Sequence, residues 1–188
     1  MGKFKEVETT GIEGLKVIEP TVFGDERGYF METYNERDLK EIGIDVTFVQ
    51  DNQSCSKKGV LRGLHFQKVF PQSKLVRVIS GKVYDVAVDL RKDSPTFGKA
   101  YGVVLSAENK KQFFIPKNFA HGFVVLSDVA EFAYKCDDYY CPKDEGGLIW
   151  NDPALGIDWP LEEAGGLINL TLSEKDKEWP TLAELFTL

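Results

Sequence analysis

Short β-prone segments, separated by turn residues, recur along most of the chain. Three of them follow one another in its centre, at residues 60–67, 74–80 and 82–90, and Ser80-Gly81 is typical of a tight turn between the last two. Further segments of the same character lie at residues 15–18, 28–34, 46–52, 101–105, 112–115, 122–126 and 129–136. Strands this short and frequent, with almost no helix between them, predict an all-β sandwich or barrel.

The segment 82–90 is expected to divide its side chains between two faces, because alternate residues of a strand point in opposite directions. One face carries Tyr84, Val86, Val88 and Leu90. The other face carries Val83, Asp85, Ala87 and Asp89. Two carboxylates beside small apolar side chains predict that this second face lines a polar interior.

Helical signals are few and short. Asn35 is a candidate N-cap for a helix over residues 36–42, which Gly43 would end. Ser173 is the expected N-cap of one further helical turn in the C-terminal quarter. The sequence shows no linker, repeat or low-complexity segment. We therefore expect a single domain over residues 1–188, with its last quarter folded back on the barrel.

Composition agrees with a soluble protein. The chain has 188 residues, of which 43% are hydrophobic, 28% charged and 12% aromatic, as is typical of one globular domain with its own core. No stretch approaches the roughly 20 apolar residues that span a bilayer. The charged start of the sequence lacks the apolar region of a secretory signal, so we expect no association with a membrane.

Cysteine content and charge narrow the choice of compartment and partner. Cys55, Cys136 and Cys141 are too few and too irregularly spaced for a disulfide framework or a zinc site, so we expect reduced thiols in the cytoplasm. The formal net charge of −7 disfavours nucleic acid as a partner. It does not exclude an anionic small ligand, because a few Arg and Lys side chains can bind a phosphate on an acidic protein.

Proton transfer is the chemistry that the residues favour. The two histidines, His65 and His121, form no His-x-His pair, although metal-dependent barrels of this shape usually need three or four ligands. Patterns typical of a nucleophilic serine, a dinucleotide site or a P-loop are absent. General acid–base catalysis needs a base, an acid, and a cation where charge develops. His65 is the candidate base, Tyr134 the acid and Lys74 the cation.

Structural roles for these residues stay open at this point. A lone histidine is more often structural or exposed than catalytic. Tyr134 also fits a core aromatic residue with a hydrogen-bonded hydroxyl, and Lys74 fits a solvated strand end. Residue types alone favour these structural roles for the tyrosine and the lysine.

Seven segments together resemble the dTDP-4-dehydrorhamnose 3,5-epimerase family of cupin-type sugar-nucleotide epimerases. The segments are residues 23–28 (FGDERG), 49–52 (VQDN), 59–65 (GVLRGLH), 85–91 (DVAVDLR), 115–123 (IPKNFAHGF), 134–136 (YKC) and 172–176 (LSEKD). One such segment would be weak support, but seven in the same order and spacing are highly specific. The resemblance covers roughly residues 12–180.

The resemblance implies a double-stranded β-helix, also called a jelly roll or cupin fold, that uses no metal and no organic cofactor. It further implies that His65 is the general base and that Asp176 is the carboxylate paired with it. Tyr134 would be the general acid, and Lys74 the cation beside the sugar's keto oxygen. The residues implied to contact the substrate are Arg27, Glu32, Gln50, Asp51, Asn52, Arg62, His121, Glu145 and Lys175.

The partner implied by the resemblance is a second copy of the chain. Family members form homodimers and exchange N-terminal strands, so Arg27 and Glu32 are expected to act in the partner subunit's site. Arg27, Arg62 and Lys175 are candidates for holding the diphosphate, because guanidinium groups suit bidentate contacts to phosphate. Tyr140 is a candidate for stacking on thymine.

The implied reaction inverts carbons 3 and 5 of dTDP-4-dehydro-6-deoxy-D-glucose and gives dTDP-4-dehydro-L-rhamnose. Related alternatives are inversion of one carbon only and a sugar-nucleotide ketoisomerase. A non-catalytic sugar-binding cupin and a metal-dependent cupin oxygenase are alternatives from other classes.

Arg62 and His65 pose a geometric problem for this reading. They are three residues apart, so a regular strand would point them to opposite faces. If both reach the cavity, the strand must bulge near Gly63, the residue best able to allow it.

Overall fold

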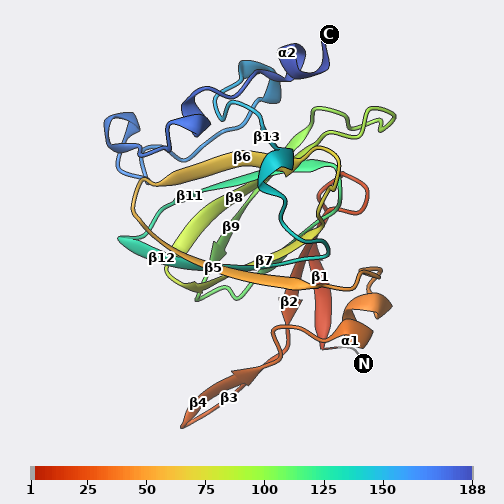
Figure 1. Ribbon diagram of the computed structural model, residues 1–188. Helices are drawn as coiled ribbons and strands as arrows, with labels where there is room; N and C mark the ends of the chain where they lie inside the picture. Colours follow the sequence, from red (N-terminus) through yellow and green to blue (C-terminus); the bar gives the residue numbers. More distant parts are fainter. Residues whose placement is uncertain (1–2, 188) are drawn as a thin grey trace.

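In the computed structural model, residues 3–187 form two antiparallel sheets that face each other, together with a small hairpin (Figure 1). The six-stranded sheet has the order β1 (Phe4–Glu8), β2 (Lys16–Pro20), β10 (Gln112–Ile115), β7 (Lys74–Ser80), β12 (Val129–Cys136) and β5 (Gln50–Lys57). The five-stranded sheet has the order β13 (Glu145–Gly147), β6 (Leu61–Gln67), β11 (Phe119–Val125), β8 (Lys82–Asp89) and β9 (Ala100–Ser106). The predicted all-β class is confirmed.

Helices are short and lie at the periphery of the sheets (Figure 1). They are α1 (Glu36–Glu41), α2 (Leu182–Phe186) and the 3₁₀ helices η1 (Pro142–Asp144), η2 (Pro153–Leu155), η3 (Leu167–Asn169) and η4 (Lys175–Lys177). None of the helices within residues 3–187 is long and apolar enough to cross a membrane. Residues 1, 2 and 188, which the predicted domain includes, lie outside the described residues.

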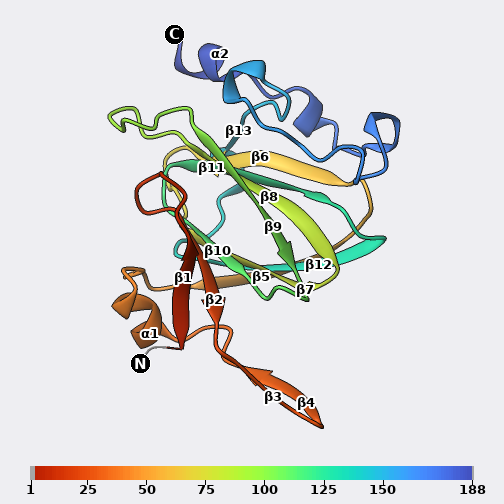
Figure 2. The same ribbon diagram turned by 180° about the vertical axis from the view of Figure 1, so that it is seen from behind.

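Two apolar layers hold the sheets in place. Side chains between the sheets form the first layer, with Val83, Phe113 and Phe132 fully or almost fully buried. The outer face of the five-stranded sheet forms the second layer, which the C-terminal quarter covers (Figures 1 and 2). Trp159 and Leu182 are among the buried residues of this layer. The last quarter therefore does fold back on the sheets, as predicted.

The predicted division of the strand at residues 82–90 is confirmed. Val83 and Ala87 belong to the layer between the sheets, whereas Val86 and Val88 belong to the outer layer. Asp85 also lies on the inner face and is fully buried.

Most of the predicted strands are present, and β7, β10 and β12 have the predicted bounds. The strand predicted at residues 46–52 is partly wrong, because β5 begins only at Gln50. Phe48 instead packs edge-on against Tyr34, at 5.7 Å between ring centroids, beside a third cluster under α1. Phe48 is therefore an apolar residue that packs within a loop and does not belong to a strand. Similarly, β4 (Gly28–Met31) ends before the predicted residue 34.

The predicted helix after Asn35 is confirmed, and the Asn35 side chain accepts a hydrogen bond from the Asp38 backbone N–H at 3.3 Å. The cap predicted at Ser173 is displaced by one residue, because η4 begins at Lys175 with Glu174 at the cap position. The Ser173 hydroxyl nevertheless accepts a hydrogen bond from the backbone N–H of Asp176.

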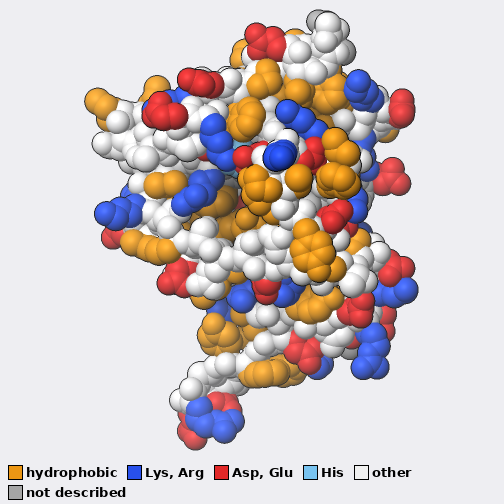
Figure 3. Space-filling model, viewed as in Figure 1, with side chains coloured by type: hydrophobic (Ala, Val, Ile, Leu, Met, Phe, Trp, Pro, Cys, Tyr) orange, Lys and Arg blue, Asp and Glu red, His pale blue; other side chains and the backbone are white. Residues whose placement is uncertain are grey.

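A hairpin of β3 (Val22–Asp25) and β4 projects away from both sheets (Figures 1 and 2). Its aromatic side chains are exposed, with 53% of Phe23, 60% of Tyr29 and 65% of Phe30 accessible to solvent. Figure 3 shows hydrophobic side chains along this arm and charged side chains at its tip. An apolar arm of this kind is typical of a surface that a partner covers.

Candidate active site

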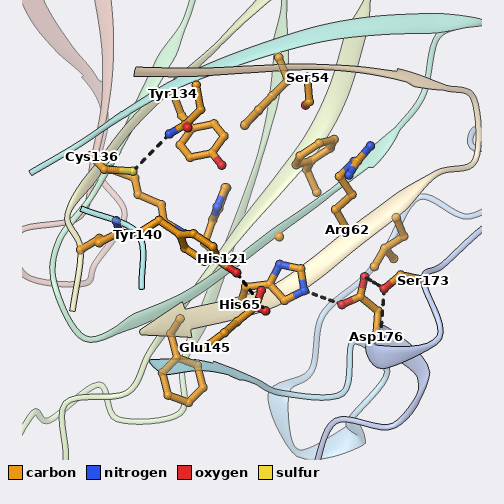
Figure 4. Close-up of a pocket in the computed structure, with 18 of the residues that line it drawn as sticks. Ser54, Arg62, His65, His121, Tyr134, Cys136, Tyr140, Glu145, Ser173 and Asp176 are labelled. Atoms are coloured by element: carbon orange, nitrogen blue, oxygen red, sulfur yellow. Dashed lines mark hydrogen bonds and ion pairs between the residues drawn. The ribbon is translucent and has the colours of Figure 1, made fainter. Parts of the chain in front are cut away.

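A cavity of about 710 Å³ opens between the two sheets and is lined by residues of both (Figure 4). His65 enters it from β6 of the five-stranded sheet. Lys74 and Tyr134 enter it from β7 and β12 of the six-stranded sheet. The structure therefore brings together the predicted base, acid and cation, with the imidazole and the phenol on opposite walls.

His65 is held by Asp176, which comes from η4 in the C-terminal segment. The Nε2 atom of His65 lies 2.5 Å from Oδ1 of Asp176. Ser173 Oγ donates a hydrogen bond to the other carboxylate oxygen at 2.8 Å, and Trp179 Nε1 donates to Oδ1 at 3.1 Å. Burial opposes ionisation of Asp176, but the hydrogen bonds outweigh this effect and hold its pKa below the usual range.

The contact with Asp176 also decides which imidazole nitrogen faces the cavity. An ionised carboxylate only accepts hydrogen bonds, so Nε2 carries the proton in this pair. In the neutral ring, Nδ1 then keeps its lone pair. His65 is thus arranged to accept a proton at Nδ1 from a molecule in the cavity.

A second histidine–carboxylate pair lies deeper in the same interior. His121 on β11 approaches Asp85 on β8, with Nε2 at 2.9 and 3.0 Å from the two carboxylate oxygens. Burial lowers the pKa of His121 and raises the pKa of Asp85. Pairing is what makes two such buried groups tolerable.

Lys74 is partly buried at the start of β7, on the cavity side. Burial lowers the pKa of its ammonium group, while Cys136, Asp85 and Glu145 act in the opposite direction. An anion that forms in the cavity would therefore meet a cation that is poorly solvated and interacts strongly.

Tyr134 presents its hydroxyl toward the cavity (Figure 4). Burial raises the pKa of this phenol, and the neighbouring Cys136 acts in the same direction. The hydroxyl consequently stays protonated at neutral pH, which is the form that can donate a proton.

Arg62 and His65 both line the cavity because β6 is irregular between them, as predicted. His121 pairs with His65 and Phe123 pairs with Arg62, so β6 uses one residue more than β11 over this stretch. Gly63 has φ +124°, and a Cβ there would lie 2.6 Å from Gly122 Cα. Only glycine fits this position.

Polar residues form the mouth of the cavity. Gln50 accepts a hydrogen bond from the backbone N–H of Tyr140 at 3.0 Å, and its amide donates to Asn52 Oδ1 at 3.0 Å. Lys175 Nζ donates to both carboxylate oxygens of Glu145, at 2.7 and 2.8 Å. These contacts join β5, β13 and η4 around one opening.

A protein-family model described as dTDP-4-dehydrorhamnose 3,5-epimerase matches residues 9–184. The chain belongs to this epimerase family. A curated dTDP-4-dehydrorhamnose 3,5-epimerase from Methanothermobacter thermautotrophicus is 55% identical to it over 184 residues, which cover 98% of this chain and 97% of the relative. The predicted resemblance and the predicted isomerase class are confirmed.

Solved structures of the epimerase family share the fold. The dTDP-4-dehydrorhamnose 3,5-epimerase of Elizabethkingia anophelis has a TM-score of 0.90 and 52% identity, covering 97% of this chain and 98% of that chain. An epimerase from Legionella pneumophila, in complex with dTDP-4-keto-L-rhamnose, has a TM-score of 0.89 and 53% identity, covering 95% of this chain and 93% of that chain. These likenesses confirm the predicted jelly-roll fold.

Three of the predicted substrate residues do not reach the cavity of this family member. Asp51 lies on the outer face of the six-stranded sheet and pairs with Lys135 at 2.6 Å, because it alternates with Gln50 and Asn52 along β5. Arg27 lies at the tip of the projecting hairpin, 2.5 Å from Asp25. Glu32 follows the hairpin and binds Lys3 at 2.5 Å.

Other residues of this epimerase site were not predicted. The strand pattern predicts Asp85 as an inward carboxylate but identifies no partner for it. The polar or aromatic lining residues that were not predicted include Ser54, Gln67, Gln72, Phe132, Cys136 and Ser173. Alternation along β5 and β12 was an available signal, because it places Ser54 beside Asn52 and both Phe132 and Cys136 beside Tyr134 on one face. Burial raises the pKa of Cys136 to about 11, so its thiol is not poised as a nucleophile.

Proposed function

We propose that the chain inverts carbons 3 and 5 of dTDP-4-dehydro-6-deoxy-D-glucose and so forms dTDP-4-dehydro-L-rhamnose. One observation carries this proposal: an imidazole and a phenol face each other from opposite sheets, in a cavity that also holds an ammonium group. The Legionella relative's complex with dTDP-4-keto-L-rhamnose supports the substrate class.

The first step is removal of a proton from carbon 3 or carbon 5. Nδ1 of His65 takes the proton, the electrons of the C–H bond form a double bond to carbon 4, and the π electrons of the carbonyl move onto the 4-keto oxygen to give an enolate. Lys74 stabilises this oxygen, since a preorganised charge contributes most where charge develops. Every proton and electron pair is accounted for by the substrate and these side chains, so the step requires no cofactor.

Inversion then needs a proton on the opposite face of the same carbon. Tyr134 donates it from the other wall, and solvent restores the phenol and the imidazole. A single residue acting from one side would only regenerate the starting sugar. The placement of the two groups on different sheets therefore suits inversion better than simple exchange.

Asp176 supports His65 in this scheme. Its ionised carboxylate fixes the tautomer with Nε2 protonated, and it stabilises the imidazolium that forms when Nδ1 accepts a proton. The hydrogen bonds from Ser173 and Trp179 keep the carboxylate in the required orientation.

The nucleotide occupies the polar mouth of the cavity in this proposal. Arg62 and Lys175 hold the diphosphate, and Tyr140, which is 47% exposed, stacks on thymine. Gln50, Asn52 and Glu145 contact the sugar or the base, and His121 lies against the sugar. The proposed roles of these residues are supported by their position in the lining of the cavity.

We propose that the chain, as one domain over residues 1–188, works as a homodimer that exchanges N-terminal strands. The exposed aromatic side chains of the β3–β4 hairpin support this assembly. Arg27 and Glu32 then act in the partner's cavity, which is the reason that they lie away from their own. All three cysteines are free, which suits a reducing cytoplasm.

Proton NMR of the 4-keto sugar nucleotide in deuterated buffer tests this function. Deuterium at carbons 3 and 5, followed by inversion at both, is the expected result. Inversion at one carbon would identify the related mono-epimerase, and migration of the keto group a ketoisomerase. Absence of any exchange would leave a sugar-binding protein and would overturn the proposal.

A further inference from the structure

Trp179 lies directly behind the histidine–carboxylate pair. Its indole Nε1 donates a hydrogen bond to Oδ1 of Asp176 at 3.1 Å, and this is the same oxygen that lies 2.5 Å from His65. Its ring also meets the imidazole of His65 edge-on, with centroids 6.2 Å apart and planes at 73°. One side chain therefore contacts both members of the pair.

The backbone of β13 is shaped to accept this indole. Gly147 is the cross-strand partner of His65 in the pairing of β13 with β6. A Cβ at Gly147 would lie 2.4 Å from the indole Cδ2 atom, so the ring occupies the space that any other residue would fill. Pro180, which follows Trp179 in the chain, accepts a hydrogen bond at its carbonyl oxygen from the Ile149 backbone N–H at 2.9 Å. This contact holds the segment that carries Trp179 beside the end of β13.

The indole also separates the pair from a second hollow. Trp179, Ile149 and Lys177 are among the residues that line this hollow of about 690 Å³, whereas Asp176 and His65 line the cavity between the sheets. Asp176 is 2% exposed. Loss of the ring would open a route for water to the back of the carboxylate.

From these contacts we propose that Trp179 is a positioning residue that orients the Asp176–His65 pair and keeps the carboxylate ionised and dry. The inference rests on the proposed function only in treating this pair as the base. The hydrogen bond acts on the charged form of the carboxylate, so it favours that form. Without it, the pair takes up a proton at higher pH.

The substitution Trp179→Phe tests the hydrogen bond, because it keeps an aromatic ring and removes the N–H. We expect kcat to fall about tenfold, since a hydrogen bond to a charged group is among the stronger ones, while KM changes less than about twofold. The acid limb of the pH profile should move to higher pH. A purely structural role for Trp179 would lower the amount of active protein and leave the pH profile in place.

Trp159→Phe is the matched control. Trp159 also donates its indole N–H, to the Trp150 carbonyl oxygen at 2.9 Å, but it does so in the outer apolar layer. We expect its pH profile to equal that of the wild-type protein. Equal effects of the two substitutions, or no shift in Trp179→Phe, would overturn the proposal.

A measurement without substrate separates this inference from the proposed function. The His65 ring protons can be followed by NMR as a function of pH in the wild-type protein and in Trp179→Phe. A titration midpoint that rises in the variant supports the positioning role even if the 4-keto sugar is not turned over. An unchanged midpoint contradicts that role even if the wild-type protein is an active epimerase.

Discussion

His65 and His121, the two histidines of the chain, are cross-strand partners between β6 and β11. Each has its own carboxylate, Asp176 for His65 and Asp85 for His121. The first pair lies at the wall of the cavity, and the second is buried more deeply. The two imidazoles are therefore neighbours with separate environments, and substitutions can distinguish their roles.

The substitution His65→Ala is expected to lower turnover by at least about a hundredfold, which is the usual scale for a general base. Turnover is measured by NMR of the sugar nucleotide, and circular dichroism checks that the sheets remain folded. A variant that turns over at the wild-type rate would remove His65 from the role of base.

Tyr134→Phe should separate proton removal from inversion. The base is intact in this variant, so deuterium still enters the substrate from heavy water, whereas the inverted product forms much more slowly. The ratio of exchange to inversion is the quantity to measure. Equal loss of both rates would speak against an acid role for the phenol.

Asn52 and Asp51 offer a matched pair of substitutions on adjacent residues. Asn52 lines the cavity, while Asp51 lies on the outer face and pairs with Lys135. We expect Asn52→Ala to raise KM about fivefold, as the loss of one hydrogen bond to substrate would. Asp51→Ala should leave kcat and KM within about twofold of wild type. An equal rise in KM for both variants would refute the placement of the substrate against this face of β5.

Exchange of the N-terminal arm predicts complementation between inactive subunits. Arg27→Ala and His65→Ala should each be nearly inactive alone. Subunits mixed after reversible unfolding should regain about a quarter of the wild-type activity, because half of the dimers are mixed and each has one complete site. Mixtures that remain inactive, although dimers form, would place Arg27 outside the partner's site.

Asp89 provides a test of stability that does not involve catalysis. Burial opposes its ionisation, but hydrogen bonds from Arg91, Thr96 and Ser94 outweigh this effect and lower its pKa to about 2. A carboxyl whose pKa is lower in the folded state stabilises the fold above its unfolded pKa of 3.8, and this stabilisation is lost as the pH falls toward 2.

We therefore expect Asp89→Asn to lower the free energy of unfolding by about 2 kcal/mol at pH 7, with the difference from wild type shrinking below pH 4. Urea unfolding at several pH values measures this, and epimerase activity should be retained. Asp93→Asn, at an exposed position of the same loop, is the control and should change stability little. A difference that grows as the pH falls would contradict the assigned sign.

The sequence was sufficient to predict those strands whose local residue pattern matches the position that they take in the folded sheets. Segments of β-prone residues located β7, β10 and β12, and the glycine between Arg62 and His65 correctly indicated an irregular strand. The same reasoning overextended β5 to Val46, because apolar residues that pack under a helix resemble those of a strand. It missed β1, β3 and β13, which are short and carry polar or glycine residues.

Contacts between distant residues could not be obtained from local patterns. Asp85 was recognised as an inward carboxylate, but its pairing with His121 depends on the register of β8 against β11. Asp51 was grouped with Gln50 and Asn52 because the three are adjacent in a family segment. The alternation of β5 places it on the opposite face, and this argument was available from the sequence alone.

The separation of His65 from Asp176 has a consequence for the moment at which the protein becomes active. The two residues are 111 positions apart, and the carboxylate belongs to a segment that docks onto β13 rather than to either sheet. A ribosome that has produced every strand of both sheets has therefore not yet produced Asp176, the carboxylate of the proposed catalytic pair. In the proposed mechanism, turnover therefore requires residues 173–180 to be synthesised and docked, which comes after synthesis of every strand of the two sheets.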